Sequence, residues 1–196
     1  MGKNRLEAFS DGVIAVAITI MVLELHAPES ASLEDLLHLL PKFLTYVLSF
    51  IYIGIYWVNH HHFYHVVHKV SGGLLWANLH LLFWLSLLPF STAWVDEHHF
   101  ATWPVATYGF NLLACSVAWS IMAWTMVRLH GRSSEIALAM GRDFKGHVST
   151  LLYLVAIGAA FFLPVISLLC YGIVALIWFV PDRRIERVLR GGQGRA

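Results

Sequence analysis

The chain has 196 residues, of which 58% are hydrophobic and only 13% are charged, with a formal net charge of +1. Soluble domains carry about 25% charged residues, so this composition excludes an ordinary soluble domain and indicates a membrane protein with several spans. The nearly neutral charge also gives no electrostatic reason to expect nucleic acid as a partner. Both cysteines lie within apolar runs and form no C-x-x-C pair, so we expect no redox or metal site from them.

Apolar stretches in the first two thirds of the chain are long enough to cross a membrane, which takes about 20 mostly apolar residues. We expect these spans at about 6–25, 43–63, 74–95 and 103–127. Pro89 lies within the third stretch and is expected to kink it. A short amphipathic helix is expected between the first two spans, because Ser32 and Asp35 have the spacing of a capping box and leucines follow at helical spacing.

The last apolar tract, residues 148–181, contains no Asp, Glu, Lys or Arg. As one helix it would be about 50 Å long, which exceeds the bilayer core. Pro164 disfavours helix at the preceding residue, so we expect two short spans, at about 148–163 and 165–181. Six spans place most Lys and Arg residues, including those of the C-terminal segment, on one side, which the positive-inside rule assigns to the cytoplasm together with both termini. The sequence therefore predicts an all-α membrane protein, with residues 1–196 forming a single domain of six transmembrane helices.

The first predicted helix carries a stripe of branched apolar side chains. At 100° per residue, Val16, Ile20 and Leu23 fall on one face of this helix, and Thr19 lies beside them. Periodicity alone favours the simpler interpretation, in which the stripe packs against another helix.

Ser10 and Asp11 lie on a different face of the same helix, close to its N-terminal boundary. A bare carboxylate within the membrane costs on the order of 2.5–3.5 kcal/mol, so Asp11 is expected to have partners. The second span ends and the third begins at the matching depth, and their polar side chains are the candidates: Trp57, Asn59, His60, His61, His62, Asn78 and His80. Hydrogen bonds from these donors would anchor the first helix to its own bundle.

A short pattern at the start of this helix resembles the signature of a known family. Arg5, Phe9, Ser10 and Asp11 form R-x-x-x-F-S-D, which is similar to the signature of the transmembrane protein 175 potassium channels. Single-unit prokaryotic members of that family assemble as homotetramers. The resemblance therefore implies a homotetrameric channel in the lipid bilayer of a prokaryotic plasma membrane, with K⁺ as the permeant ion and no cofactor.

The resemblance also implies which residues line the pore. In that family the first helices surround the pore, and rings of bulky apolar side chains lie five, nine and twelve residues after the motif aspartate. Here these positions are Val16, Ile20 and Leu23, and the first of them departs from the isoleucine that is more frequent in the family. Thr19 would add a hydroxyl beside the rings. The sequence contains no T-V-G-Y-G, so a hydrophobic constriction is expected instead of a filter made of backbone carbonyls.

Histidine is unusually frequent, with 12 residues, and supports an alternative function. His61, His65 and His68 are spaced to share one helical face, as in a histidine-rich metal-binding protein or metal transporter. No acidic residue lies in that stretch, and histidines at an interface also suit hydrogen bonding to the motif, so we expect no bound metal. A non-conducting membrane scaffold is a further alternative. No nucleophile, base and orienting residue stand out together, so we do not expect an enzyme.

Overall fold

The computed structural model of the chain describes residues 2–28, 30–131, 134, 136–137 and 144–179. Every regular element in these ranges is a helix, which confirms the expected all-α class. The helices are α1 (Lys3–Leu23), α2 (Leu33–His38), α3 (Leu40–His65), α4 (Gly72–Ser86), α5 (Leu88–Glu97), α6 (Thr102–His130), α8 (Phe144–Ala159) and α9 (Pro164–Phe179).

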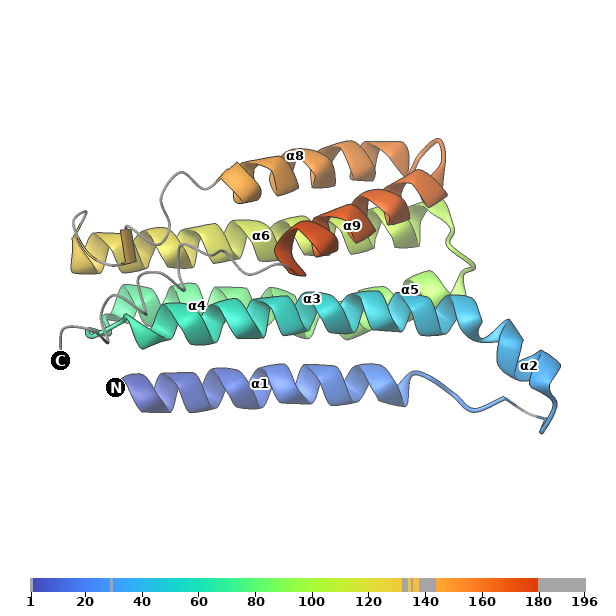
Figure 1. Ribbon diagram of the computed structural model, residues 1–196, viewed down its shortest axis with the longest axis horizontal. Coiled ribbons are helices and arrows are strands. Elements are labelled where there is room, and N and C mark those ends of the chain that lie inside the picture. Colours follow the sequence, from blue (N-terminus) through green and yellow to red (C-terminus); the bar gives the residue numbers. More distant parts are fainter. Residues whose placement is uncertain (1, 29, 132–133, 135, 138–143, 180–196) are drawn as a thin grey trace.

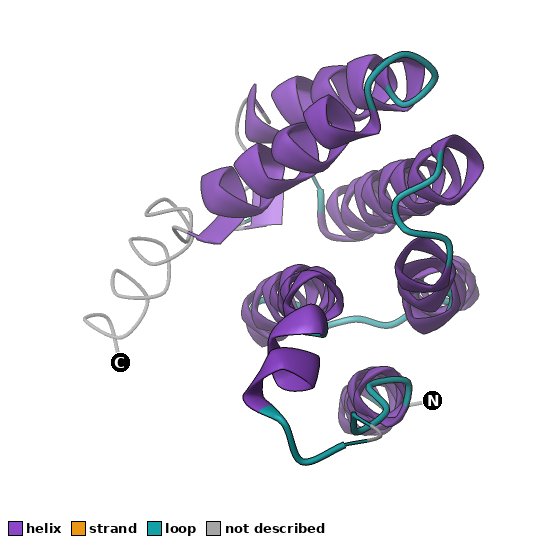
Figure 2. Cartoon of the chain, turned by 90° about the vertical axis from the view of Figure 1, so that its right-hand side faces the viewer, coloured by secondary structure: helices purple, strands orange, loops and turns teal. Residues whose placement is uncertain are grey.

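The long helices lie side by side and alternate in direction along the chain (Figure 1). The start of α1, the end of α3, the start of α4 and the end of α6 share one end of the bundle, at the left of Figure 1. Helix α1 packs on α3, α4 and α5, whereas the α8–α9 hairpin packs on α6 and α3. Viewed end-on, α1 therefore lies at the edge of the bundle, on the side opposite the hairpin (Figure 2). An edge position leaves part of the α1 surface uncovered by the other described helices.

Four of the described segments are long and apolar enough to cross a membrane: α1, α3, the continuous segment Gly72–Glu97, and α6. Helix α4 ends at Ser86, and α5 begins at Leu88 with Pro89 in its first turn, so the third segment breaks at the expected proline. In the described residues α8 and α9 have 16 residues each; α8 ends at Ala159, earlier than the expected 163, and Pro164 is the first residue of α9. Residues 180–181 of the last expected span and the C-terminal arginines lie outside the described residues.

The short helix α2 begins with the expected cap. The Ser32 hydroxyl accepts a hydrogen bond from the backbone N–H of Asp35 at 3.1 Å, which satisfies one of the free donors of the first turn. The Ser30 hydroxyl also donates to the Asp35 carboxylate. No residue of α2 is buried, so this helix presents leucines outward, as an amphipathic surface helix does.

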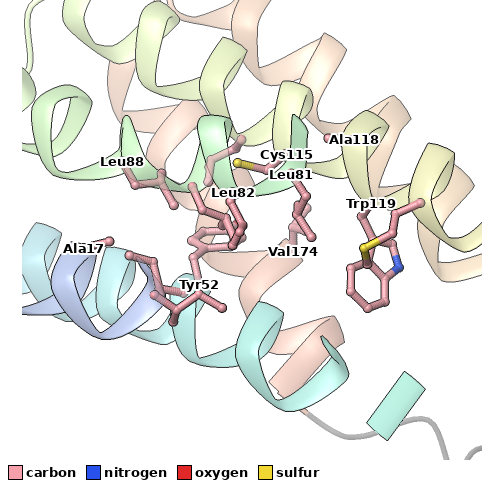
Figure 3. Packing of buried hydrophobic residues seen from close by; sticks show 14 of the residues in the cluster. Ala17, Tyr52, Leu81, Leu82, Leu88, Cys115, Ala118, Trp119 and Val174 are labelled. Atoms are coloured by element: carbon pink, nitrogen blue, oxygen red, sulfur yellow. The ribbon is translucent and has the colours of Figure 1, made fainter. Parts of the chain in front are cut away.

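The core joins α3, α4, α6 and α9 through apolar side chains such as Leu81, Cys115 and Val174 (Figure 3). A tyrosine contact ties the hairpin to this core: the Tyr52 hydroxyl donates to the backbone oxygen of Tyr171 at 2.6 Å. The Tyr171 hydroxyl in turn donates to the backbone oxygen of Val105 at 3.2 Å. Buried hydroxyls are thus paired with carbonyls on neighbouring helices, as a bilayer environment requires.

Glycine at one position of α6 is required by close packing. A Cβ atom added to Gly109 would lie 1.9 Å from the Tyr171 hydroxyl oxygen and 3.0 Å from Ile157. The Tyr171 side chain of α9 therefore occupies the space that any larger residue at position 109 would need. Small residues at such crossings allow membrane helices to approach closely.

Candidate functional site

Helix α1 has one face buried against its own chain and another left open. Its buried residues follow each other at helical spacing: Leu6, Ser10, Ile14, Ala17 and Met21. The stripe identified from the sequence lies about 120° away from this face. Its side chains are largely exposed, with 55% for Val16, 43% for Ile20 and 73% for Leu23. Among the described residues, no helix packs on the stripe, whereas the simpler interpretation placed it against another helix.

A shallow groove runs along the open face of α1. Phe9, Gly12, Val16 and Ile20 line it, and Ser86 at the end of α4 forms its rim. Phe9, the aromatic residue of the motif, is 49% exposed and belongs to this open surface. The surface is almost entirely apolar and continuous over several turns of the helix. Such patches on a protein mark a contact with another molecule or with lipid.

Thr19 lies beside the stripe and is exposed. Its hydroxyl donates to backbone oxygens of its own helix, 3.1 Å from Ala15 and 2.9 Å from Val16. The proton is therefore used internally, and the oxygen lone pairs remain toward the open face. Thr19 can accept a hydrogen bond or contact a cation there, but it has no second proton to donate.

Ser10 belongs to a buried polar cluster that crosses three helices. The Ser10 hydroxyl donates to the Leu6 backbone oxygen at 2.8 Å and accepts from the Asn78 amide at 2.9 Å. The Asn78 side-chain oxygen lies 2.8 Å from His60 Nε2 and accepts a longer bond from the Tyr64 hydroxyl at 3.5 Å. Because Asn78 uses its amide nitrogen on Ser10, its oxygen is the acceptor and His60 carries its proton on Nε2.

This buried polar cluster is well shielded. Ser10 and Asn78 are 0% exposed, and the His60 ring stacks on Tyr64 with 4.3 Å between centroids. Buried donors and acceptors that lose a partner cost about 1–3 kcal/mol each, so the cluster fixes how α1 is rotated against α3 and α4. That rotation also determines which residues of α1 remain on its open face.

Asp11 has a different partner and remains exposed. Trp57 Nε1 donates to the Asp11 carboxylate at 3.0 Å, and the His61 ring stacks on Trp57 with centroids 6.3 Å apart. One turn further, His65 meets His61 edge-on at 4.8 Å. Lys3 at the start of α1 donates to the His65 backbone oxygen at 3.3 Å. The N-terminal half of α1 is thus tied to α3 both at the motif and at the helix end.

Several predicted partners of the motif bond elsewhere. His80 Nε2 accepts a hydrogen bond from the Trp84 indole at 2.9 Å, so its partner lies within α4 and not in the motif. The Asn59 amide donates to the Ile55 backbone oxygen at 2.8 Å, within its own helix. The His62 ring is 6.0 Å from that of His61. Arg5 is exposed on the open side of the helix start.

The sequence analysis did not predict Tyr64 as a member of the buried polar cluster, although its spacing of four residues from His60 indicates a shared face.

The histidines of the described residues do not gather into a metal site. No group of three or more His, Cys, Asp or Glu side chains in the described ranges is arranged to hold a metal ion. His130 Nε2 instead accepts hydrogen bonds from the backbone N–H groups of His68 and Lys69, both at 3.1 Å. This contact closes the loop after α3 onto the end of α6. The geometry therefore gives these histidines a structural use.

Comparisons with known proteins find a matching family and similar relatives. A family model described as "Endosomal/lysosomal potassium channel TMEM175" matches residues 5–89. A protein of Chryseobacterium sp. (strain P1-3) that is named a potassium channel is 52% identical over 190 residues, covering 97% of this chain and 99% of that protein. A potassium channel of Streptomyces collinus is 31% identical, with coverage of 90% and 91%.

A solved structure has the same fold. The crystal structure of a lysosomal potassium-selective channel TMEM175 homolog from Chamaesiphon minutus superimposes with a TM-score of 0.78 at 29% sequence identity. The match covers 91% of this chain and 96% of that one. The similarity therefore extends over the hairpin α8–α9 as well as the helices that carry the motif.

Proposed function

The chain belongs to the TMEM175 family, and on that premise we propose that it forms a potassium-permeable cation channel in the membrane of a prokaryotic cell. The observation that carries the proposal is the open apolar stripe of α1, which the other described helices leave uncovered. The relative that is 52% identical over nearly its whole length is named a potassium channel, which supports the same function.

One α1 helix cannot enclose a path for ions, so the channel is a homotetramer with four α1 helices around its axis. Val16, Ile20 and Leu23 then form three apolar rings, spaced over about 10 Å along the helix. An apolar ring that is too narrow for a hydrated ion imposes a desolvation barrier, and this barrier is the constriction. Thr19 adds a layer of hydroxyl oxygens between the rings.

The motif R-x-x-x-F-S-D acts by positioning α1. Ser10 is held by Asn78, and Asp11 is held by Trp57, so that the two polar residues point away from the stripe. The buried polar cluster therefore presents the rings to the axis without contacting the ions itself. No cofactor is needed for this mechanism, because conduction requires only a water-filled path and an electrochemical driving force across the membrane.

The channel crosses the bilayer with both termini in the cytoplasm. This orientation follows from the excess of Lys and Arg in the terminal segments and in the loops on that side. It places the motif and the histidines of α3 near the cytoplasmic boundary, and Leu23 nearer the outside. K⁺ is the permeant ion, and the partners are the three other subunits and the surrounding lipid.

The decisive experiment is single-channel recording of the purified protein in a planar bilayer, with K⁺ and Na⁺ on opposite sides. We expect unitary currents whose reversal potential is shifted from zero toward the equilibrium potential of K⁺. Native mass spectrometry of the same preparation should give the mass of four subunits. A tetramer that conducts no cation would contradict the proposed channel function. A conducting monomer or dimer would contradict a pore formed by four α1 helices.

A further inference from the structure

A second group of buried polar side chains, the outer cluster, lies beside the break in the third span, in the half of the bundle away from the motif. Its members come from three helices and are at most 4% exposed: Ser49 of α3, Ser91 and Thr92 of α5, and Tyr108 and Asn111 of α6. Polar groups buried within a membrane protein need partners from the protein itself, because the bilayer core offers none.

The hydrogen bonds of the outer cluster form a chain with one direction. The Thr92 hydroxyl donates to the Leu88 backbone oxygen at 2.7 Å, so it has no second proton and accepts from the Ser49 hydroxyl at 2.8 Å. Ser49 has then used its own proton and accepts from the Tyr108 hydroxyl at 3.0 Å. The chain therefore runs from α6 through α3 and ends on the backbone of α5.

A second chain reaches the same carbonyl. The Asn111 amide nitrogen donates to the Ser91 hydroxyl at 3.1 Å, and Ser91 donates to the Leu88 backbone oxygen at 3.2 Å. The Asn111 side-chain oxygen is buried and has no hydrogen-bond partner among the described residues. Both chains converge on Leu88, the residue before Pro89, and hold the start of α5 against α3 and α6.

Helix α5 also supports the half of α1 that carries the outer rings. Met21, the last buried residue of α1, lines a small cavity of about 60 Å³ together with Pro89 and Thr92 of α5. Because of this cavity, the contact between α1 and α5 leaves room for movement. Ser86, just before the break, lines the open face of α1 beside Ile20. The position of α5 therefore limits how far this end of α1 can move.

The break separates this support from the one near the motif. Pro89 cannot donate the N–H that an unbroken helix would give to Leu85, so α4 and α5 are separate helices that meet at Leu87. Asn78 holds α4 to the N-terminal half of α1 through Ser10. The two halves of α1 thus rest on two helices, each with its own polar anchor.

We propose that Tyr108 and Asn111 are positioning residues for the outer rings of the constriction, formed by Ile20 and Leu23. Both side chains are buried within the subunit and act through α5, which sets how far the outer half of α1 lies from the axis. The inference rests on the proposed function, because it takes α1 as the lining of the pore. Loss of either anchor widens the motion of the outer rings and leaves the inner ring, Val16, in place.

The test measures how fast a water-soluble methanethiosulfonate reagent modifies single cysteines in the reconstituted full-length protein. Leu23→Cys reports the outer end of α1, and Val16→Cys reports the inner ring. Both are made with Cys170→Ala, because the remaining Cys115 is fully buried. Tyr108→Phe removes only the hydroxyl that starts the first chain. We expect it to raise the Leu23→Cys rate about threefold, the equilibrium factor of one average hydrogen bond between membrane helices, with no change at Val16.

Asn111→Leu separates positioning from stability. It removes the bond to Ser91 together with the buried oxygen that has no described partner, so the free energy of unfolding should change little. The Leu23→Cys rate should still rise, because α6 no longer holds α5 through this chain. General loosening of the fold would not produce a faster rate at unchanged stability.

Tyr52→Phe is the matched control. Tyr52 is also buried, but its hydroxyl donates to the Tyr171 backbone oxygen of α9 at 2.6 Å. This variant should keep both cysteine rates at their wild-type values even if it is less stable. An equal rise of the Leu23→Cys rate in Tyr52→Phe and Tyr108→Phe would overturn the proposal. So would an unchanged rate in Tyr108→Phe or in Asn111→Leu, or equal rises at Leu23 and Val16.

The cysteine rates and the ion currents test different statements. Native mass spectrometry of each variant checks that the tetramer is retained. A tetramer without cation current contradicts the proposed channel, whereas the cysteine rates still show whether the outer cluster positions α1. Normal currents together with cysteine rates that neither Tyr108→Phe nor Asn111→Leu alters would overturn the positioning role alone.

Discussion

Replacing Asn78 by leucine removes the centre of the buried polar cluster while keeping the number and branching of its side-chain heavy atoms. The change deletes the donor to Ser10 at 2.9 Å and the acceptor for His60 at 2.8 Å. The His60 N–H is then buried without a partner, which costs about 1–3 kcal/mol. Ser10 still donates to Leu6, so its lost bond contributes nearer to the 0.6 kcal/mol average measured between membrane helices. We expect a loss of about 2–3 kcal/mol in the free energy of unfolding.

The assay is reversible unfolding of the reconstituted protein, compared by midpoint and by fitted free energy. Ser10→Ala serves as the second corner of a double-mutant cycle with Asn78→Leu. Because both changes remove the same hydrogen bond, the double variant should be about 0.5–1.5 kcal/mol more stable than the sum of the single losses predicts. Strict additivity, or an Asn78→Leu variant as stable as wild type, would refute the idea that this cluster anchors α1.

Three further predictions concern the pore, the motif and the core. Ile20→Asn should wet the constriction, so that unitary conductance rises and cations are discriminated less; Ile18→Asn, on a partly buried face, should instead lower tetramer yield. Comparable currents from both would place the pore elsewhere. Asp11→Ala should reduce tetramer yield on gel filtration and leave the reversal potential nearly unchanged, since its carboxylate is bound to an indole. A large shift of that potential at normal yield would show that Asp11 faces the ions. Gly109→Ala should destabilise the fold by about 1–3 kcal/mol through overpacking against Tyr171, and an unchanged melting temperature would contradict that contact.

Local chemistry determines much of this protein without any tertiary contact. The apolar segments had to become helices, because a bilayer leaves no other way to satisfy backbone groups along a single segment. The break before Pro89 and the cap at Ser32 could also be predicted from the sequence, because each depends on one residue and its immediate neighbours. Helical periodicity likewise put Val16 and Ile20 on one stripe.

The partners of the motif were decided only by the tertiary structure. The sequence offered both Asn78 and His80 as partners of the motif, because both lie at a similar depth in the membrane. They are about 200° apart around α4, so only one of them can face α1. The rotation of α4 gives that position to Asn78 and turns His80 toward Trp84. Helix rotation depends on how all the side chains between the helices pack, and the sequence of one helix does not contain that information. The contact of Gly109 with Tyr171 joins residues from α6 and α9 for the same reason, and only the folded chain reveals it.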